Sequence, residues 1–313
     1  MTPFDRRAVR ETAQRTLAEA DRSHKKLVLI HTGAMLALAL ALMLIDLLLS
    51  QKISGTGGLG GITTRSHLAT VQAALRMAEL AVVPFWQAGY TYLTLQLSQG
   101  KSVSFKTLTE GFVRFGPILR LLLLQLALYL IAGFASINIS STIFMISPWA
   151  KPFFNVATQM QQGVEYTEEM LLAVTGDALI PLLVITLLPY LCLAIFIFYH
   201  YRLAMYSLLD DEETTALSAM RNSRILTKGH KLQMLKLDLS FWWYYACELL
   251  VAALCFLDLI LPSLGVHLPL PQPAITFLGF GIYAAAQLLL HYWRKNEVNV
   301  TYAQVYNTLM EEE

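Results

Sequence analysis

Four ionisable side chains lie within long apolar stretches of the sequence, where their types could support binding or proton chemistry inside a membrane. They are Arg76, Glu79, Glu248 and Asp258. Charged groups are costly in lipid, so they usually face a bundle interior, a water-filled cavity or an opposite charge. We therefore take these four residues as the candidate intramembrane polar site.

Glu248 is the deepest of the four, and no basic residue lies one helical turn away from it. It needs a partner on another helix, a cavity that holds water, or a bound proton. Two interpretations stay open for it, a functional group or a structural hydrogen-bonding group. Arg76 and Glu79 are three residues apart on one helix face, so they can form a local ion pair. Asp258 lies close enough to the end of its apolar stretch to reach water.

The sequence contains none of the common catalytic motifs, such as a Walker loop, HExxH or GxSxG. Gly55 to Gly60 matches GxGxxG formally, but the match follows no strand and opens no βαβ unit. The seven histidines are scattered, and Cys192, Cys247 and Cys255 lie in apolar runs without metal-ligand spacing. We expect no enzyme activity, no metal and no cofactor.

The elements that would position the polar residues are membrane-spanning helices. Charged residues make up 14% of the 313, against about 25% in a soluble chain. Six runs are long enough to cross a bilayer as helix. They are residues 28–49, 71–98, 118–147, 178–209, 236–261 and 273–293. The sequence therefore predicts an all-α membrane protein with one transmembrane domain over 28–293.

The distribution of Lys and Arg predicts the orientation of these spans. The N-terminal segment, the second and fourth loops and the C-terminal tail carry 17 of them, and the opposite loops carry three. Positive charge collects in cytoplasmic loops. We expect the 1–27 segment and the 294–313 tail to be cytoplasmic.

Residues 1–27 are expected to form a cytoplasmic amphipathic helix that begins near Thr2 and Pro3. Its less polar stripe is Val9, Ala13, Leu17 and Ala20. Such a helix either packs on the other cytoplasmic segments or lies on anionic lipid headgroups. The 148–177 loop has two interpretations as well, an interfacial anchor and a lid.

A short cytoplasmic helix is also expected between the fourth and fifth spans. Asp210 and Asp211 would cap it, and Glu212 and Glu213 would occupy its first turn, near the positive end of the helix dipole. Lys228 would lie in the last turn, and Gly229 would follow the helix.

The region around this helix resembles the bacterial membrane proteins of the domain-of-unknown-function 975 family. The matching residues are Tyr201, Arg202, Asp210, Ser223, Lys228, Gly229, Asp238, Ser240 and Phe241. Supporting matches lie at 108–112 and 303–309, whereas the 148–177 and 262–273 loops depart from the family pattern. The resemblance implies a six-helix membrane fold and no particular activity. The layout is more loosely similar to the membrane domain of some glycerophosphodiester phosphodiesterases, which hints at lipids.

These observations favour a non-enzymatic protein of the bacterial plasma membrane that binds or moves a lipid or other amphipathic substrate. Spans two and four contain prolines, which kink helices, and with Glu248 they would border a cavity. The alternative is a scaffold or accessory subunit that binds a protein partner through its basic cytoplasmic face. The expected partners are thus membrane lipids, or a protein at that face, and a near-neutral net charge argues against nucleic acid.

Overall fold

The structure is a computed structural model that describes residues 4–20, 23–55, 59–165, 167–266 and 269–312. Some side chains within these ranges lie outside the description, namely those at 50–55, 59–68, 72, 76, 78, 80, 170–175 and 177–179. The described residues form helices and the turns between them, with no strand, as the sequence predicts. The chain divides into two compact units, residues 1–118 with 203–313 and residues 119–202.

Five helical stretches are long and apolar enough to cross a membrane. They are Ser23–Leu49, Phe115–Ile146, Ile180–Asp210, Trp242–Ser263 and Gln272–Glu311. The sixth predicted span, 71–98, lies within the 40-residue helix α3 but is not among the five. Six spans and cytoplasmic termini therefore stay predictions. Apolar side chains such as Leu249 and Leu250 are about 70% exposed, as expected for helices whose solvent is lipid.

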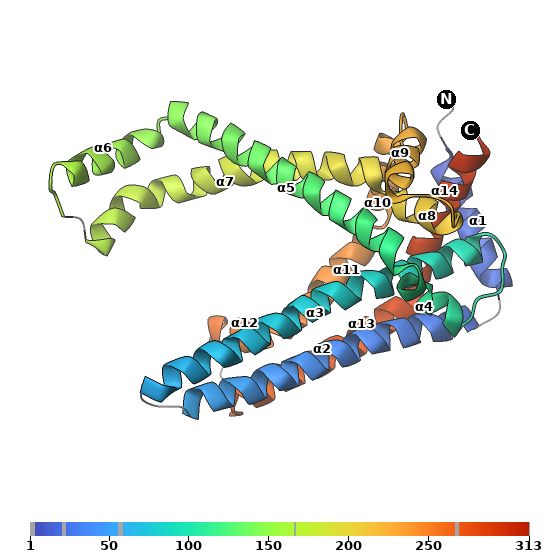
Figure 1. Ribbon diagram of the computed structural model, residues 1–313, viewed down its shortest axis with the longest axis horizontal. Helices are drawn as coiled ribbons and strands as arrows, with labels where there is room; N and C mark the ends of the chain where they lie inside the picture. The colour runs from blue at the N-terminus through green and yellow to red at the C-terminus, as the bar shows by residue number, and fades with distance from the viewer. Residues whose placement is uncertain (1–3, 21–22, 56–58, 166, 267–268, 313) are drawn as a thin grey trace. The chain divides into compact units, whose positions relative to one another are not determined.

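The first unit contains three long helices and a set of short ones at one end. The long helices are α2 (Ser23–Gly55), α3 (Leu59–Ser98) and α13 (Gln272–Leu290), and α2 and α3 lie side by side (Figure 1). The predicted fifth span is divided into α10 (Lys231–Ser240), α11 (Trp242–Ala253), η1 (Leu254–Phe256) and α12 (Leu257–Ser263). After α13, a π-helical turn η2 (His291–Lys295) leads directly into α14 (Asn296–Glu311).

The short helices form the best-packed part of this unit. They are α1 (Arg6–Glu19), α4 (Phe105–Val113), α8 (Ala204–Asp210) and α9 (Ala216–Leu226), together with α10 and α14. A buried apolar core joins α1, α4 and α14 to the adjoining parts of α2 and α3, and it is lined by Ala13, Leu27, Val28, Tyr90, Leu93, Leu97, Leu108 and Val300. We call this region the packed end.

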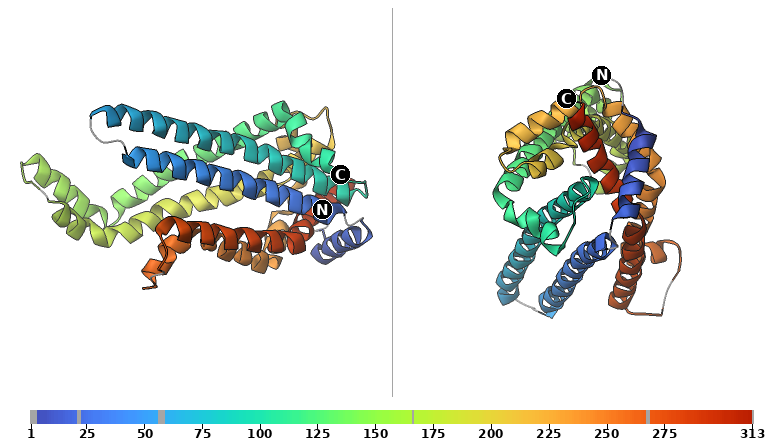
Figure 2. Two further views of the ribbon diagram at one scale, coloured as in Figure 1. Left: turned by 90° about the horizontal axis from the view of Figure 1, so that it is seen from below. Right: turned by 90° about the vertical axis from the view of Figure 1, so that its right-hand side faces the viewer.

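Helix α1 lies against α14 (Figure 2), and its apolar stripe is covered by the chain itself. Val9 and Ala13 are 6% and 0% exposed. Of the two interpretations of this segment, packing on other parts of the chain fits, because no apolar stripe is left to enter lipid. Asp5 caps α1 by accepting a hydrogen bond from the Arg7 nitrogen, and the predicted cap, Thr2, lies outside the described residues.

The cap predicted for the helix after Asp210 is wrong. The Asp211 carboxylate accepts hydrogen bonds from the Glu213 nitrogen at 3.0 Å and the Thr214 hydroxyl at 2.9 Å. This local turn competes with helix formation, so α9 begins later and Thr215 caps it. Glu212 and Glu213 therefore precede the helix, and Lys228 lies beyond its end at Leu226.

Helices α3 and α4 approach closely at two glycines. A Cβ atom added to Gly89 would lie 1.9 Å from the Leu108 carbonyl oxygen, and one on Gly111 would lie 1.9 Å from the Phe85 carbonyl oxygen. Any side chain at either position would force the two backbones apart. The α4 segment is thereby fixed against α3.

The second unit consists of α5 (Phe115–Ile146), of which residues 115–118 belong to the first unit, and α6 (Ala150–Gln161) and α7 (Glu168–Tyr201). Ser136 and Ser140 of α5 donate hydrogen bonds to the backbone oxygens of Thr186 and Ile185. Hydroxyl-to-backbone bonds of this kind hold helices together where lipid supplies no partner. Helix α7 continues through Pro181 and Pro189.

Candidate functional site

Glu248 on α11 accepts hydrogen bonds from three side chains. Its Oε1 atom lies 2.7 Å from His291 Nε2 and 2.5 Å from the Tyr244 hydroxyl, and its Oε2 atom lies 2.7 Å from Gln287 Nε2. Two of these partners come from the α13–η2 segment. Glu248 therefore has the inter-helix partners that its position requires.

The helix from α13 through η2 supplies most of the polar groups of the site. Tyr283, Gln287, His291 and Lys295 are each four residues apart, so they follow one face of the helix. The π-helical turn begins at His291 and ends at Lys295, and turns of this kind are frequent at functional sites. The other polar residues of α13, Gln272 and Thr276, lie in its first two turns, and the remainder of the helix is apolar.

Two adjacent residues of α2 extend the network. His291 Nδ1 lies 2.8 Å from the Thr32 hydroxyl, and Lys295 Nζ lies 3.4 Å from His31 Nδ1. The His31 ring stacks on Trp86 and lies 4.5 Å from the Tyr90 ring, centre to centre. The Trp86 indole also donates a hydrogen bond to the His31 carbonyl oxygen. The aromatic residues of α3 thus fix the position of His31.

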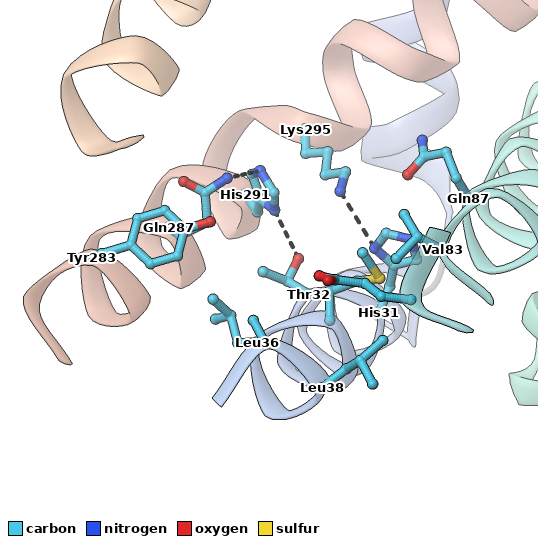
Figure 3. Close-up of a pocket in the computed structure, with 13 residues that line it drawn as sticks. His31, Thr32, Leu36, Leu38, Val83, Gln87, Tyr283, Gln287, His291 and Lys295 are labelled. Atoms are coloured by element: carbon cyan, nitrogen blue, oxygen red, sulfur yellow. Dashed lines mark hydrogen bonds between the residues drawn. The ribbon is translucent and has the colours of Figure 1, made fainter. Parts of the chain in front are cut away.

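A cavity of about 280 Å³ lies among α2, α3 and the α13–η2 segment (Figure 3). Its polar end is formed by His31, Thr32, Gln87, Gln287, His291 and Lys295. Beyond this end the lining is mainly apolar, from Met35, Leu36, Leu38, Ala39 and Val83, with Tyr283 and Glu79. Figure 3 shows Lys295 and His291 extending from one helix toward His31 and Thr32 of α2. The cavity is therefore amphipathic.

Two buried atoms of the polar end have no hydrogen-bond partner within the described chain. They are Nε2 of His31 and Oε1 of Gln287. Buried polar atoms are satisfied in most native structures. Both residues line the cavity, so a molecule bound there could satisfy them.

The other sequence candidates lie at different places. Glu79 lines the cavity away from its polar end, and the side chain of Arg76 lies outside the described residues. Asp258 accepts a hydrogen bond from Thr276 at 3.2 Å and so joins α12 to α13, and it is not among the lining residues. Of the two proline-containing spans, α3 borders the cavity, whereas none of the described lining residues comes from α7.

Sequence reasoning missed the residues of the polar end. His31, Thr32, Gln287 and His291 are individually unremarkable, and Lys295 was assigned to the C-terminal tail. The four-residue spacing from Tyr283 to Lys295 was the available signal. A pattern of this kind indicates one polar helix face but not the helices that it meets.

Nine residues carry the family resemblance described above, and we call them the resemblance residues. Most of them lie at the packed end, and none is among the residues that line the cavity. Asp210 accepts hydrogen bonds from Gln99, the residue that follows α3, and from Tyr306 of α14, which ties α8 to both segments. The Asp238 carboxylate accepts hydrogen bonds from the hydroxyls of Tyr245 and Tyr302.

The remaining resemblance residues have local roles. Ser223 accepts a bond from the Leu203 nitrogen, and Arg10 lies over the buried Phe241 ring. Ser240 bonds the Leu237 carbonyl oxygen, and Gly229 has a φ of 85°, which favours glycine. Tyr201 and Arg202 contact the His200 and Phe198 rings, and Lys228 is exposed. The contacts of these residues, the exposed Lys228 excepted, lie within the chain and favour an architectural role.

Helical structure throughout the described chain, with five helices apolar enough to cross a bilayer, defines the class of helical membrane proteins. A family model described as "Protein of unknown function (DUF975)" matches residues 16–310, and the chain belongs to this family. Comparisons with curated proteins and with solved structures gave no match. Within the described residues, no group of three or more His, Cys, Asp and Glu side chains could hold a metal ion.

Proposed function

We propose that this protein is a non-enzymatic protein of the bacterial plasma membrane that binds or moves a lipid or other amphipathic substrate. The observation that carries the proposal is the amphipathic cavity among α2, α3 and the α13–η2 segment. Its polar end would receive a headgroup, and its apolar lining would receive aliphatic chain. Ligand sites of this composition occur between the helices of bundles.

The cavity volume limits what can bind inside it. Small-molecule pockets usually enclose about 300–1,000 Å³, and this one is close to the lower end of that range. A complete phospholipid is too large, so the cavity would take a headgroup with the first part of one chain, or a short amphiphile. The remainder of a longer chain would lie against the apolar helix surfaces.

Glu248 would act on the site indirectly. Glu248 does not line the cavity, but it accepts hydrogen bonds from Gln287 and His291, and both of these residues line it. Because Tyr244 donates to the same carboxylate, α11 fixes the rotamers of the polar face of α13. We therefore assign Glu248 a positioning role.

A matched pair of substitutions on α2 tests the proposal. Ala39 lines the cavity, whereas Ala37 is exposed on the same helix and does not line it. Ala39→Trp should fill the cavity, and Ala37→Trp adds the same bulk outside it. We expect lipid mass spectrometry of the full chain in native nanodiscs to find a species enriched with the wild type and Ala37→Trp, and at least fivefold depleted with Ala39→Trp.

Other outcomes of this experiment would contradict the proposal. Identical lipid profiles for wild type, Ala39→Trp and an unrelated membrane protein would show that the cavity selects no lipid. A protein that co-purifies stoichiometrically, with bulk lipid only, would favour the scaffold alternative. Thermal unfolding of both variants checks that each retains the wild-type fold.

A further inference from the structure

We infer that the molecule bound in the cavity is an amphiphile with an anionic headgroup, carboxylate or phosphate, which Lys295 pairs with. This inference rests on the proposed function and names the substrate class for the same site. It follows from the charge balance around the polar end, from the hydrogen-bonding state of His31 and from the apolar lining of the rest of the cavity.

Lys295 is a half-buried cation that forms no close ion pair in the described part of the chain, although the Glu248 carboxylate acts on it electrostatically. Its contacts are His31 Nδ1 at 3.4 Å and the face of the Tyr90 ring at 4.9 Å. A charge removed from water is unfavourable unless an opposite charge and hydrogen bonds compensate it. The cation–π contact with Tyr90 supplies part of that compensation.

Two carboxylates near the α13–η2 segment already have hydrogen-bond or ion-pair partners. Glu248 accepts from His291, Gln287 and Tyr244. Glu297, two residues after Lys295, pairs with Arg10 at 3.0 Å and Arg294 at 2.5 Å. The chain thus supplies partners for these two acids and leaves the cation between them open to an anion from outside.

His31 provides a second group suited to an anion. Lys295 is a donor only, so the His31 Nδ1 atom that it contacts must be the acceptor. The ring proton then resides on Nε2, which is the buried atom without a partner. His31 and Lys295 both line the cavity, so an anionic oxygen there would accept from a neutral donor and a cation together.

The far end of the cavity determines which way the ligand lies. Glu79 precedes Gln87 by eight residues on α3, which places it about 12 Å along the helix from the polar end. The apolar side chains of Met35, Leu36 and Val83 line the space between the two ends. The geometry therefore selects an anionic head followed by aliphatic carbon.

Binding of ten-carbon probes that differ only in the head tests this inference. The probes are decyl phosphate, decanoate, decanol and decyltrimethylammonium, measured with the full chain in nanodiscs by competition against radiolabelled decyl phosphate. We expect at least one anionic probe to bind tenfold or more tighter than decanol and decyltrimethylammonium. Comparison of decyl phosphate with decanoate identifies the head, and inorganic phosphate alone should compete at least 100-fold more weakly than decyl phosphate.

Substitutions of Lys295 separate charge from structure. Lys295→Gln should lose at least tenfold affinity for the anionic probes and leave decanol unchanged, whereas Lys295→Arg should keep the anionic preference. Lys106→Gln removes an exposed lysine outside the cavity and should change nothing.

The outcomes distinguish the two proposals. If all four probes bind within threefold of each other and Ala39→Trp blocks them all, the anionic inference is overturned and the binding function stands. If Ala39→Trp affects no probe, the cavity is not the binding site and the proposed function fails. Equal competition by inorganic phosphate and decyl phosphate would overturn the assignment of an amphiphile.

Discussion

Glu248 of α11 and His291 of η2 are 43 residues apart in the chain, and their Oε1 and Nε2 atoms lie 2.7 Å from each other. Gln287 joins the same carboxylate one turn earlier on α13. The contact brings α11 to the polar face that lines the cavity. It explains how an acidic residue in a long apolar stretch is accommodated, because the carboxylate accepts from three donors.

Substitution of Glu248 should weaken the packing of α11 on α13. An interhelical hydrogen bond in a membrane protein contributes about 0.6 kcal/mol on average, so losing the bonds to His291 and Gln287 in Glu248→Leu should cost about 1 kcal/mol. Glu248→Gln keeps an acceptor and should cost less. Thermal unfolding in detergent measures both, with the exposed Glu11→Leu as control. If Glu248→Leu retains both wild-type stability and lipid retention, the positioning role is wrong.

The glycine contact between α3 and α4 should be intolerant of even one methyl group. Gly111→Ala places a Cβ atom 1.9 Å from the Phe85 carbonyl oxygen, and relief requires backbone movement. Overpacking of this kind costs about 1–3 kcal/mol. Gly116→Ala is the matched control, because a Cβ atom there would meet nothing within 4 Å apart from the backbone of its own helix and its chain neighbours. Equal unfolding temperatures for the two variants would contradict the close approach.

Adjacent aspartates should differ sharply in their effect on the packed end. Asp210 bonds Gln99 after α3 and Tyr306 of α14, whereas the described bonds of Asp211 are to Glu213 and Thr214 within its own turn. Asp210→Ala should therefore lower the unfolding temperature clearly more than Asp211→Ala. The reverse order would show that the resemblance residue Asp210 is not architectural.

The contribution of the Asp211 turn to the stability of the protein should depend on pH. The hydrogen bonds from the Glu213 nitrogen and the Thr214 hydroxyl lower the pKa of the Asp211 carboxyl below its ordinary value of 3.8. A lowered pKa means that the ionised form stabilises the fold above the unfolded-state value, and that this contribution is lost as pH falls through the folded-state value. The stability difference between wild type and Asp211→Ala should thus be constant from pH 5 to 7 and shrink only below about pH 3.8. A decrease already between pH 7 and 5 would be inconsistent with this assignment.

The helical class followed from the sequence because long apolar runs have few alternatives in lipid. The location of the cavity did not, because it depends on which helix faces meet. Glu248 was identified because it is isolated in an apolar run. It does not line the cavity itself, whereas its hydrogen-bond partners Gln287 and His291 do. Lys295 was assigned to the tail because the sequence does not show that α13 continues through η2 into α14. The start of α9 was placed too early because the Asp211 turn competes locally with the helix.

Membrane orientation is testable independently of the cavity. The predicted six spans place the termini and the 99–117 loop on the cytoplasmic side and the 148–177 loop outside. In a chain with its three cysteines replaced, Lys101→Cys and Glu311→Cys should react with a membrane-impermeant maleimide only after cells are opened. Gln162→Cys should react in intact cells. Labelling of Glu311→Cys in intact cells would require an odd number of spans, or the opposite orientation.

The most direct test of the central claim is to locate a bound amphiphile in the chain. A decyl phosphate analogue with a diazirine on its chain would be photolysed in nanodiscs, and the labelled peptides would be sequenced. We predict labels at Met35, Leu36 or Ala39 of α2 and at Tyr283 of α13, lost with Ala39→Trp and with excess unlabelled decyl phosphate. Labels spread over the exposed apolar faces of the helices and insensitive to both would contradict a substrate-binding cavity in this protein.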